Sequence, residues 1–176
     1  MTTTTDRLKA AIREVPDFPK PGILFKDITP VLADARLYAE ATAAMADPWR
    51  NAGITQLVAI EARGFLFGAP VAQALGAGLV PVRKPGKLPA PRLREEYALE
   101  YGADALEMHR DALPVGARVL VVDDVLATGG TAAAACALVE RAGGTVVGVG
   151  VFIDLAFLGG RSRLAGRRVE SVVTWT

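Results

Sequence analysis

The sequence has few of the residues from which disulfides and histidine-based metal sites are built. Its 176 residues include one cysteine, Cys136, and one histidine, His109. A single cysteine excludes an internal disulfide and favours a cytoplasmic location. His109 has no second histidine or cysteine near it in the chain, so neither metal binding nor catalysis is expected of it.

Charge of one sign and long apolar runs are also scarce. The net charge is +1 at pH 7, so attraction to nucleic acid or to a membrane would require local clusters of charge. No apolar run is as long as a membrane span, and the threonine-rich N-terminus lacks the apolar centre of a signal peptide. We therefore expect neither a membrane nor nucleic acid as a partner, and one globular domain over residues 1–176.

Apolar runs and helical stretches alternate along the chain, which predicts an α/β fold. Strands are expected at 57–60, 79–83, 119–122 and 145–153. Helices are expected at 6–15, with Asp6 as the N-cap, and at 35–45, 65–75 and 131–142. Residues 84–94 are expected to form an exposed mobile loop, and 97–101 one arm of a hairpin.

This order predicts a mostly parallel sheet with helices on both faces. Ligands of such sheets bind beyond the carboxyl ends of the strands. Three candidate segments, 61–64, 83–87 and 123–131, each follow an expected strand. We therefore expect them to converge on one site.

Residues 119–131, Val-Leu-Val-Val-Asp-Asp-Val-Leu-Ala-Thr-Gly-Gly-Thr, are the most informative stretch. Four branched apolar residues predict a buried strand that ends before Asp123 and Asp124. A Thr-Gly-Gly-Thr turn then leads into an alanine-rich helix. Glycine lets the backbone approach an anion, and the N–H groups at a helix start attract negative charge. With carboxylates that accept hydrogen bonds from hydroxyls, the stretch predicts a cradle for a sugar and its phosphate.

Two other glycine-rich nucleotide motifs do not fit this turn. The Walker loop needs a lysine after its last glycine, whereas Gly130 is followed by Thr131. The three spaced glycines of the dinucleotide fingerprint are missing. Neighbouring residues of a regular strand point to opposite faces, so Asp123 and Asp124 either lie where the chain twists or have different tasks. A solvated strand end is the alternative to a binding site.

The 119–131 run resembles the phosphoribosyl-diphosphate motif of the type I phosphoribosyltransferases. Four further stretches narrow the resemblance to the members that use adenine: 18–28 (Phe-Pro-Lys-Pro-Gly-Ile-Leu-Phe-Lys-Asp-Ile), 61–65 (Glu-Ala-Arg-Gly-Phe), 83–89 (Arg-Lys-Pro-Gly-Lys-Leu-Pro) and 99–102 (Leu-Glu-Tyr-Gly). The resemblance covers about residues 15–164. It implies a central mostly parallel sheet flanked by helices, a flexible loop, and a small hood from about 15–30 and 97–102.

The resemblance also assigns the sugar and phosphate groups. Asp123 and Asp124 would hold the ribose hydroxyls, directly or through water. The 5′-phosphate would be bound by Ala127, Thr128, Gly129, Gly130 and Thr131. Pyrophosphate would be bound by Glu61, Ala62, Arg63, Gly64, Arg83, Lys84 and Lys87. In that family the loop at 61–64 often holds a cis peptide, which would fall between Glu61 and Ala62.

The basic stretch that contains Arg83, Lys84 and Lys87 has other possible uses. It could bind nucleic acid, but no aromatic residue interleaves the charges for base stacking. It could also be a solvated loop. A lid over pyrophosphate is the more economical hypothesis, because a leaving group with several negative charges needs cations that close over it. The resemblance implies that part of this set reaches across a dimer interface.

The base would be bound by Leu24, Phe25 and Lys26, with the Phe25 ring stacked on adenine and the backbone of its neighbours reading the base edge. Glu100 is the candidate catalytic residue, since the resemblance places its carboxylate over the purine, where it would assist proton movement.

The resemblance thus implies transfer of phosphoribosyl from phosphoribosyl diphosphate to adenine in a homodimer. Mg²⁺ would be bound mainly through substrate, with no direct protein ligand. Two alternatives stay open: transfer to another purine, or a non-catalytic regulator that senses phosphoribosyl diphosphate.

Overall fold

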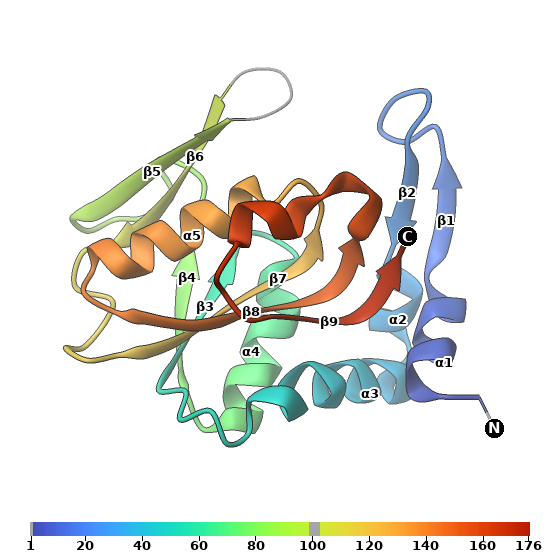
Figure 1. The fold of residues 1–176 in the computed structure, drawn as a ribbon, viewed down its shortest axis with the longest axis horizontal. Helices are drawn as coiled ribbons and strands as arrows, with labels where there is room; N and C mark the ends of the chain where they lie inside the picture. The colour runs from blue at the N-terminus through green and yellow to red at the C-terminus, as the bar shows by residue number, and fades with distance from the viewer. Residues whose placement is uncertain (1, 99–102) are drawn as a thin grey trace.

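The computed structural model describes residues 2–98 and 103–176. At its centre is a five-stranded sheet in the order β4-β3-β7-β8-β9, in which every neighbouring pair is parallel (Figure 1). The strands are β3 (Gln56–Ile60), β4 (Gly78–Val82), β7 (Arg118–Leu126), β8 (Thr145–Leu155) and β9 (Val169–Trp175). The expected α/β class and parallel sheet are confirmed. β9 was not expected, because only Val173 of this edge strand is fully buried and the strand lacks a continuous apolar run.

Helices cover both faces of the sheet. On one face lies α5 (Gly130–Arg141), and on the other lie α1 (Thr4–Ala11), α2 (Thr29–Ala33), α3 (Ala35–Ala46) and α4 (Gly64–Leu75). Alternate residues of β7 enter opposite cores: Val119 and Val121 pack toward α5, and Leu120 and Val122 pack toward α4. A strand buried on both faces reads as an unbroken apolar run, which is why β7 and β8 were predictable.

Three short 3₁₀ helices complete the helical content of the described residues: η1 (Asp47–Trp49), η2 (Ala156–Leu158) and η3 (Gly160–Leu164). In the part of the chain that the structure describes, no helix has the length and apolar character to cross a membrane.

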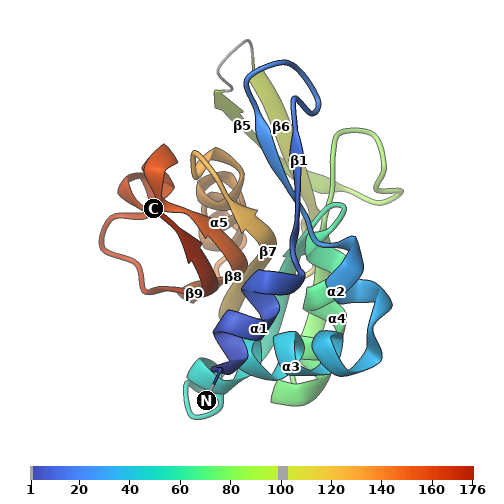
Figure 2. The same ribbon diagram turned by 90° about the vertical axis from the view of Figure 1, so that its right-hand side faces the viewer.

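Two antiparallel hairpins rise on the same side of the molecule, one toward each end (Figures 1 and 2). One consists of β1 (Arg13–Pro16) and β2 (Leu24–Asp27), and the other of β5 (Arg92–Ala98) and β6 (Ala103–His109). The predicted loop over 84–94 is therefore too long, because Arg92 and Arg94 belong to β5. The hairpin arm expected at 97–101 is present in its first residues, and 99–102 lie outside the described residues.

The N-terminal helix differs from the expected one at both ends. Its N-cap is Thr3, and Asp6 is the third helical residue, whose carboxylate accepts a hydrogen bond from the Thr3 backbone at 3.0 Å. In this reciprocal capping box Thr3 is the N-cap and Asp6 is the N3 residue, so Asp6 does not cap the helix as expected. The helix ends at Ala11 because Arg13–Pro16 pairs with β2 as one strand of a hairpin, which helical periodicity does not reveal.

Candidate active site

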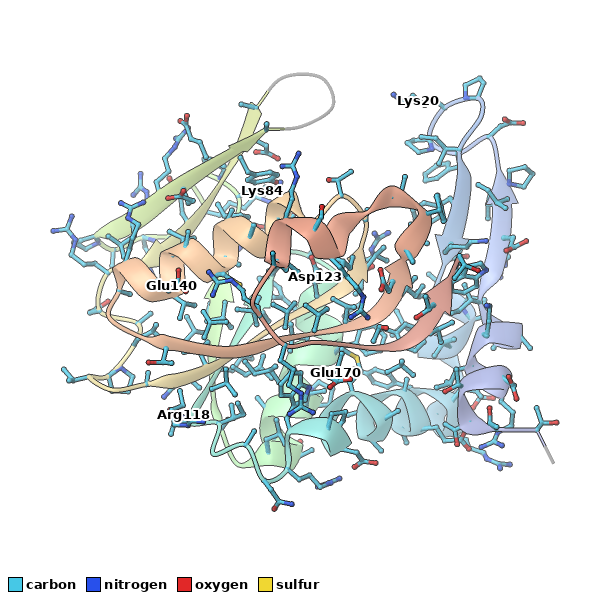
Figure 3. The ribbon with its side chains drawn as sticks, in the orientation of Figure 1. Lys20, Lys84, Arg118, Asp123, Glu140 and Glu170 are labelled. Carbon is cyan, nitrogen blue, oxygen red and sulfur yellow. The ribbon has the colours of Figure 1, made fainter. Side chains whose placement is uncertain are left out.

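A cavity of about 670 Å³ opens at the carboxyl ends of β3 and β7, beside the β1–β2 hairpin. It brings together most of the predicted site residues: Leu24, Phe25, Lys26, Glu61, Ala62, Arg63, Lys84, Asp123, Asp124, Ala127 and Thr131. Figure 3 labels Lys84 and Asp123, which reach it from two different segments. Parallel strands end at one edge of the sheet, so residues distant in sequence meet there.

Four lining residues were missed by sequence reasoning: Ile23, Val125, Leu155 and Leu158. The strand expected to end at Ile153 runs on through Leu155, and η2 follows directly. Parallel strands place their carboxyl ends at one edge of the sheet. A predicted strand that extended to Leu155 would therefore have placed this residue at the site. Ile23 and Val125 lie within the stretches 18–28 and 119–131 but were assigned no role of their own, and no local signal identified Leu158.

The Thr-Gly-Gly-Thr turn joins β7 to α5. Thr128 and Gly129 line a second hollow of about 60 Å³, which they share with Asp123, Ala127 and Thr131. Gly129 has φ +80°, a conformation that favours glycine. Gly130 is the first residue of α5, so the free N–H groups at the start of a twelve-residue helix lie in this turn. The turn can bind an anion through its backbone.

The turn is backed by η3. A Cβ atom on Gly129 would lie 2.3 Å from the Gly160 carbonyl oxygen, and one on Gly160 would lie 2.2 Å from the Ala127 oxygen. Both distances are far below a van der Waals contact. The two backbones therefore approach so closely that neither position has room for a side chain.

The acidic pair lies inside β7, so the expectation that the strand ends at Val122 is wrong. Asp124 is buried and Asp123 half-buried, yet both line the cavity. The Asp123 carboxylate accepts a hydrogen bond from the Asp124 N–H at 2.9 Å, which folds it along the backbone. Burial, together with the neighbouring Asp124 carboxylate, raises the pKa of Asp123 well above its usual range. The two carboxylates therefore line one site, although neighbouring residues of a regular strand point to opposite faces.

Arg63 lies between the acidic pair and the aromatic side of the cavity. Its Nε forms an ion pair with Asp124 Oδ2 at 2.5 Å. The geometry of this pair is not that of a hydrogen bond, and the oxygen accepts none from the described residues. The guanidinium also lies 5.3 Å from the centre of the Phe25 ring. The peptide bond between Glu61 and Ala62 is cis, as the resemblance implied. A Cβ on Gly64 would lie 2.9 Å from Asp123 Oδ1, so glycine lets this turn approach β7.

The predicted pyrophosphate cations surround carboxylates. Glu61 accepts a hydrogen bond from the Lys84 N–H at 2.9 Å and pairs with Arg83 Nε at 3.3 Å and with Lys87 Nζ. Burial alone would raise the pKa of Glu61, but the Lys87 and Lys84 hydrogen bonds and the nearby cationic charges lower it. The Lys84 ammonium turns to the β5–β6 hairpin, where it pairs with Asp104 and lies 2.6 Å from Tyr97 Oη.

On the base side, the Phe25 ring meets Phe18 edge-on at 5.1 Å between centres. The Lys26 side chain points away from this aromatic pair: it pairs with Glu14, and its Nζ lies 4.7 Å from the centre of the Trp175 ring. The backbone of Lys26 is thus the part available to a ligand. Glu100 lies outside the described residues.

A doubly covered parallel sheet, an acidic pair near the carboxyl end of its central strand and a following turn that can bind an anion are the features of a type I phosphoribosyltransferase. The phosphoribosyl transferase domain model matches residues 30–170. A relative named adenine phosphoribosyltransferase from Myxococcus xanthus is 58% identical over 174 residues, which span 99% of this chain and 95% of that protein. The chain belongs to the adenine phosphoribosyltransferase family.

Solved structures give the same result. The crystal structure of adenine phosphoribosyltransferase from Rhodothermus marinus is 54% identical, has a TM-score of 0.94, and covers 99% of this chain and 100% of that one. The Saccharomyces cerevisiae enzyme, solved with adenine and an imino-altritol bisphosphate, is 39% identical with a TM-score of 0.91, and the match covers 98% of this chain and 99% of that one.

Proposed function

We propose that this chain transfers the 5-phosphoribosyl group from phosphoribosyl diphosphate to adenine, giving AMP and pyrophosphate. The observation that carries the proposal is that one cavity is lined by the β2 segment, the acidic pair and the turn into α5. A nucleotide consists of a base, a ribose and a phosphate. The β2 segment, the acidic pair and the turn are chemically suited to these three groups in that order. The yeast relative that was solved with adenine and a bisphosphate supports the same pairing of ligands.

In this proposal the 5′-phosphate is bound by backbone N–H groups of residues 127–131 and by the hydroxyls of Thr128 and Thr131. Asp123 and Asp124 accept hydrogen bonds from the ribose diol. Two carboxylates held side by side suit two neighbouring hydroxyls, and their negative charge favours the oxocarbenium character that the ribose acquires as its anomeric bond breaks.

Adenine lies against Phe25, and the backbone of Leu24 and Lys26 reads its edge. Phe25 lines the cavity, and the Arg63 guanidinium lies 5.3 Å from the centre of its ring, so adenine would take the place of the guanidinium on this ring or use its other face. Backbone N–H and C=O groups can match a donor–acceptor pair on the base. Glu100 carries the proton that moves on the imidazole side of adenine.

Pyrophosphate is bound by the 61–64 turn and by Arg83, Lys84 and Lys87. Its departure places negative charge on the leaving group, so cations positioned there stabilise the transition state electrostatically. Residues 15–30 and 97–102 would form the hood of a single domain, and part of the basic segment would serve the partner's site in a homodimer. The single cysteine, a buried free thiol, supports a cytoplasmic location.

The acidic pair fits Mg²⁺ as a cofactor. Asp124 Oδ2 is buried and has Arg63 Nε beside it at 2.5 Å, and Mg²⁺ prefers carboxylate and water oxygens. The described residues contain no group of three or more His, Cys, Asp or Glu arranged to hold a metal. We propose that substrate oxygens hold most of the ion, with Asp123 and Asp124 contacting it through water. When bound, it would neutralise charge on the leaving group.

A competition assay tests the base. The protein, phosphoribosyl diphosphate and Mg²⁺ are mixed with adenine, hypoxanthine, guanine and xanthine, and the nucleotide products are separated. The proposal predicts AMP as the dominant product with one pyrophosphate released per AMP. Preference for another purine contradicts the choice of base. Binding of phosphoribosyl diphosphate without any turnover contradicts catalysis and favours a regulator.

The role of Glu100 has its own test. Glu100→Ala is expected to lower kcat by about 10²-fold, because a positioned proton carrier contributes roughly that much. The KM for phosphoribosyl diphosphate should change little. Glu96→Ala, which removes an exposed carboxylate from the neighbouring strand β5, is the matched control. Unchanged turnover in Glu100→Ala would refute the assignment.

A further inference from the structure

The cations proposed for pyrophosphate are already paired with carboxylates of the same chain. Glu61 pairs with both Arg83 and Lys87, and Asp104 pairs with Lys84. Glu61 itself comes from the turn proposed for pyrophosphate, although a carboxylate repels that ligand. Asp104 lies on β6, outside every motif that carried the family resemblance. These two carboxylates therefore need an explanation that anion binding alone does not supply.

Burial makes the Glu61 pairs substantial. The Glu61 side chain is only 10% exposed, whereas those of Arg83 and Lys87 are 35% and 46% exposed. A buried carboxylate needs partners, because leaving it unpaired incurs its desolvation penalty. Arg83 Nε, the Lys84 N–H and Lys87 Nζ supply them, and these groups come from one short segment. Glu61 thus holds that segment beside the cavity.

Asp104 performs the same task for the third cation. Its carboxylate pairs with Lys84 Nζ and accepts a hydrogen bond from Tyr97 Oη at 3.2 Å, so Lys84 is held by a carboxylate and a phenol together. Lys84 nevertheless lines the main cavity. Its ammonium can therefore exchange Asp104 for an anion in the cavity by rotating its own side chain.

We propose that Glu61 and Asp104 are resident counter-ions of the pyrophosphate subsite. They keep Arg83, Lys84 and Lys87 in place, and pyrophosphate binds by taking these cations from them. This inference rests on the proposed function of those three residues. The affinity for pyrophosphate is then a difference between two sets of ion pairs, which keeps a product with several negative charges from being held too tightly.

A purely bracing role makes the opposite prediction. If the two carboxylates serve only to shape the basic segment, removing either of them loosens the segment and weakens pyrophosphate binding. If they compete with pyrophosphate, removing either one strengthens it. The sign of the change in affinity therefore separates the two roles.

The test uses calorimetric titration of the full-length protein with pyrophosphate, and separately with AMP, at fixed Mg²⁺. Glu61→Gln and Asp104→Asn each keep the side-chain shape and remove the charge. Each is expected to lower the Kd for pyrophosphate about two- to fivefold, the range for freeing a cation from a partly exposed pair. The Kd for AMP should change by less than about twofold. Glu96→Gln, which breaks the exposed Arg94 pair on the same hairpin, should leave both constants unchanged.

A second variant identifies the cation. In Glu61→Gln combined with Lys87→Met, the gain in pyrophosphate affinity over Lys87→Met alone should be smaller than the gain of Glu61→Gln over the unaltered protein, because only Arg83 is then left to be released. Weaker or unchanged pyrophosphate binding in both Glu61→Gln and Asp104→Asn overturns the counter-ion role, and Asp104→Asn decides alone if Glu61→Gln does not fold. Failure of the unaltered protein to bind pyrophosphate and AMP would instead contradict the proposed function.

Discussion

At the scale of single residues, the site holds a carboxylate, Asp123, whose charge the fold does not favour. Asp124 is 5% exposed, and the pKa of Asp123 is raised by burial and by that neighbour. Such an arrangement serves binding rather than stability, because two adjacent carboxylates repel each other in an environment of low polarity. A diol or a hydrated cation between them would relieve the repulsion.

The raised pKa of Asp123 predicts how the free energy of unfolding depends on pH. A carboxyl whose folded pKa is raised contributes less stability as the pH rises from its ordinary value of 3.8 through the folded pKa. Asp123→Asn should therefore raise the free energy of unfolding at pH 7 by about 1 kcal/mol, the usual size of such site substitutions. The gain should shrink as the pH falls toward 3.8.

Urea denaturation at several pH values measures this effect, with AMP binding recorded in parallel. AMP affinity should fall in Asp123→Asn although the protein becomes more stable. The control is Asp111→Asn at an exposed position, which should shift stability by less than about 0.5 kcal/mol. A less stable Asp123→Asn protein at pH 7 would contradict the account.

At the scale of elements, the phosphate turn depends on a segment far along the chain. Gly160 of η3 is buried, and its backbone touches that of Ala127 and Gly129. Arg161 of the same segment pairs at 2.6 Å with Asp154, which is 1% exposed, and also donates to the Val169 carbonyl. The end of β8, the start of β9 and η3 thus form one support behind the turn.

Gly160→Ala should disturb this support. Its methyl group would lie 2.2 Å from the Ala127 oxygen, so the turn or η3 must move. We expect a loss of about 1–3 kcal/mol of stability and an increase of about tenfold or more in KM for phosphoribosyl diphosphate. Steady-state kinetics and thermal unfolding measure the two effects. Ser162→Ala, an exposed change in the same segment, is the control, and normal KM in Gly160→Ala would show that the turn does not need this contact.

The β1–β2 hairpin is attached to the last strand through one aromatic ring. Trp175 has Lys9 Nζ 4.8 Å and Lys26 Nζ 4.7 Å from its ring centre, and Lys9 also donates to the Thr174 carbonyl at 2.8 Å. Each cation–π contact contributes about 0.5–1 kcal/mol at a partly exposed site. Because Lys26 lies on β2, this contact orients the strand whose backbone is proposed to read adenine.

Trp175→Ala should therefore raise the KM for adenine about three- to tenfold and change the KM for phosphoribosyl diphosphate less than about twofold, since a misplaced backbone weakens only the base contacts. Trp175→Tyr keeps a π-face and should restore most of the affinity. Initial-rate kinetics with each substrate varied in turn decide the matter. Equal effects on both KM values would indicate a general loss of stability instead.

At the scale of the whole molecule, the sequence was informative where apolar runs are continuous. The strands near 57–60, 119–122 and 145–153, and the helices near 35–45, 65–75 and 131–142, are present with small shifts at their ends. β1, β2 and β9 were not predicted, because their strand character comes from pairing, β1 with β2 in a hairpin and β9 with β8, rather than from local apolar alternation.

The site shows the same difference between what the local sequence indicates and what only tertiary packing determines. Convergence of the three candidate segments was predictable, because parallel strands bring their carboxyl ends to one edge. The carboxylate partners of the basic residues were not, since Glu61 meets Lys87 and Asp104 meets Lys84 only through tertiary packing. The support of Gly129 by Gly160 was equally invisible, because a glycine's need for space depends on a neighbour far along the chain.

The central claim is that the β2 segment, the acidic pair and the 127–131 turn form one site for a nucleotide. A crystal structure of the protein with AMP tests it most directly. The account predicts the 5′-phosphate on the N–H groups at the start of α5, the ribose diol at Asp123 and Asp124, and the base against Phe25. AMP bound outside this cavity, or with its base away from Phe25 and its phosphate away from the turn, would contradict it.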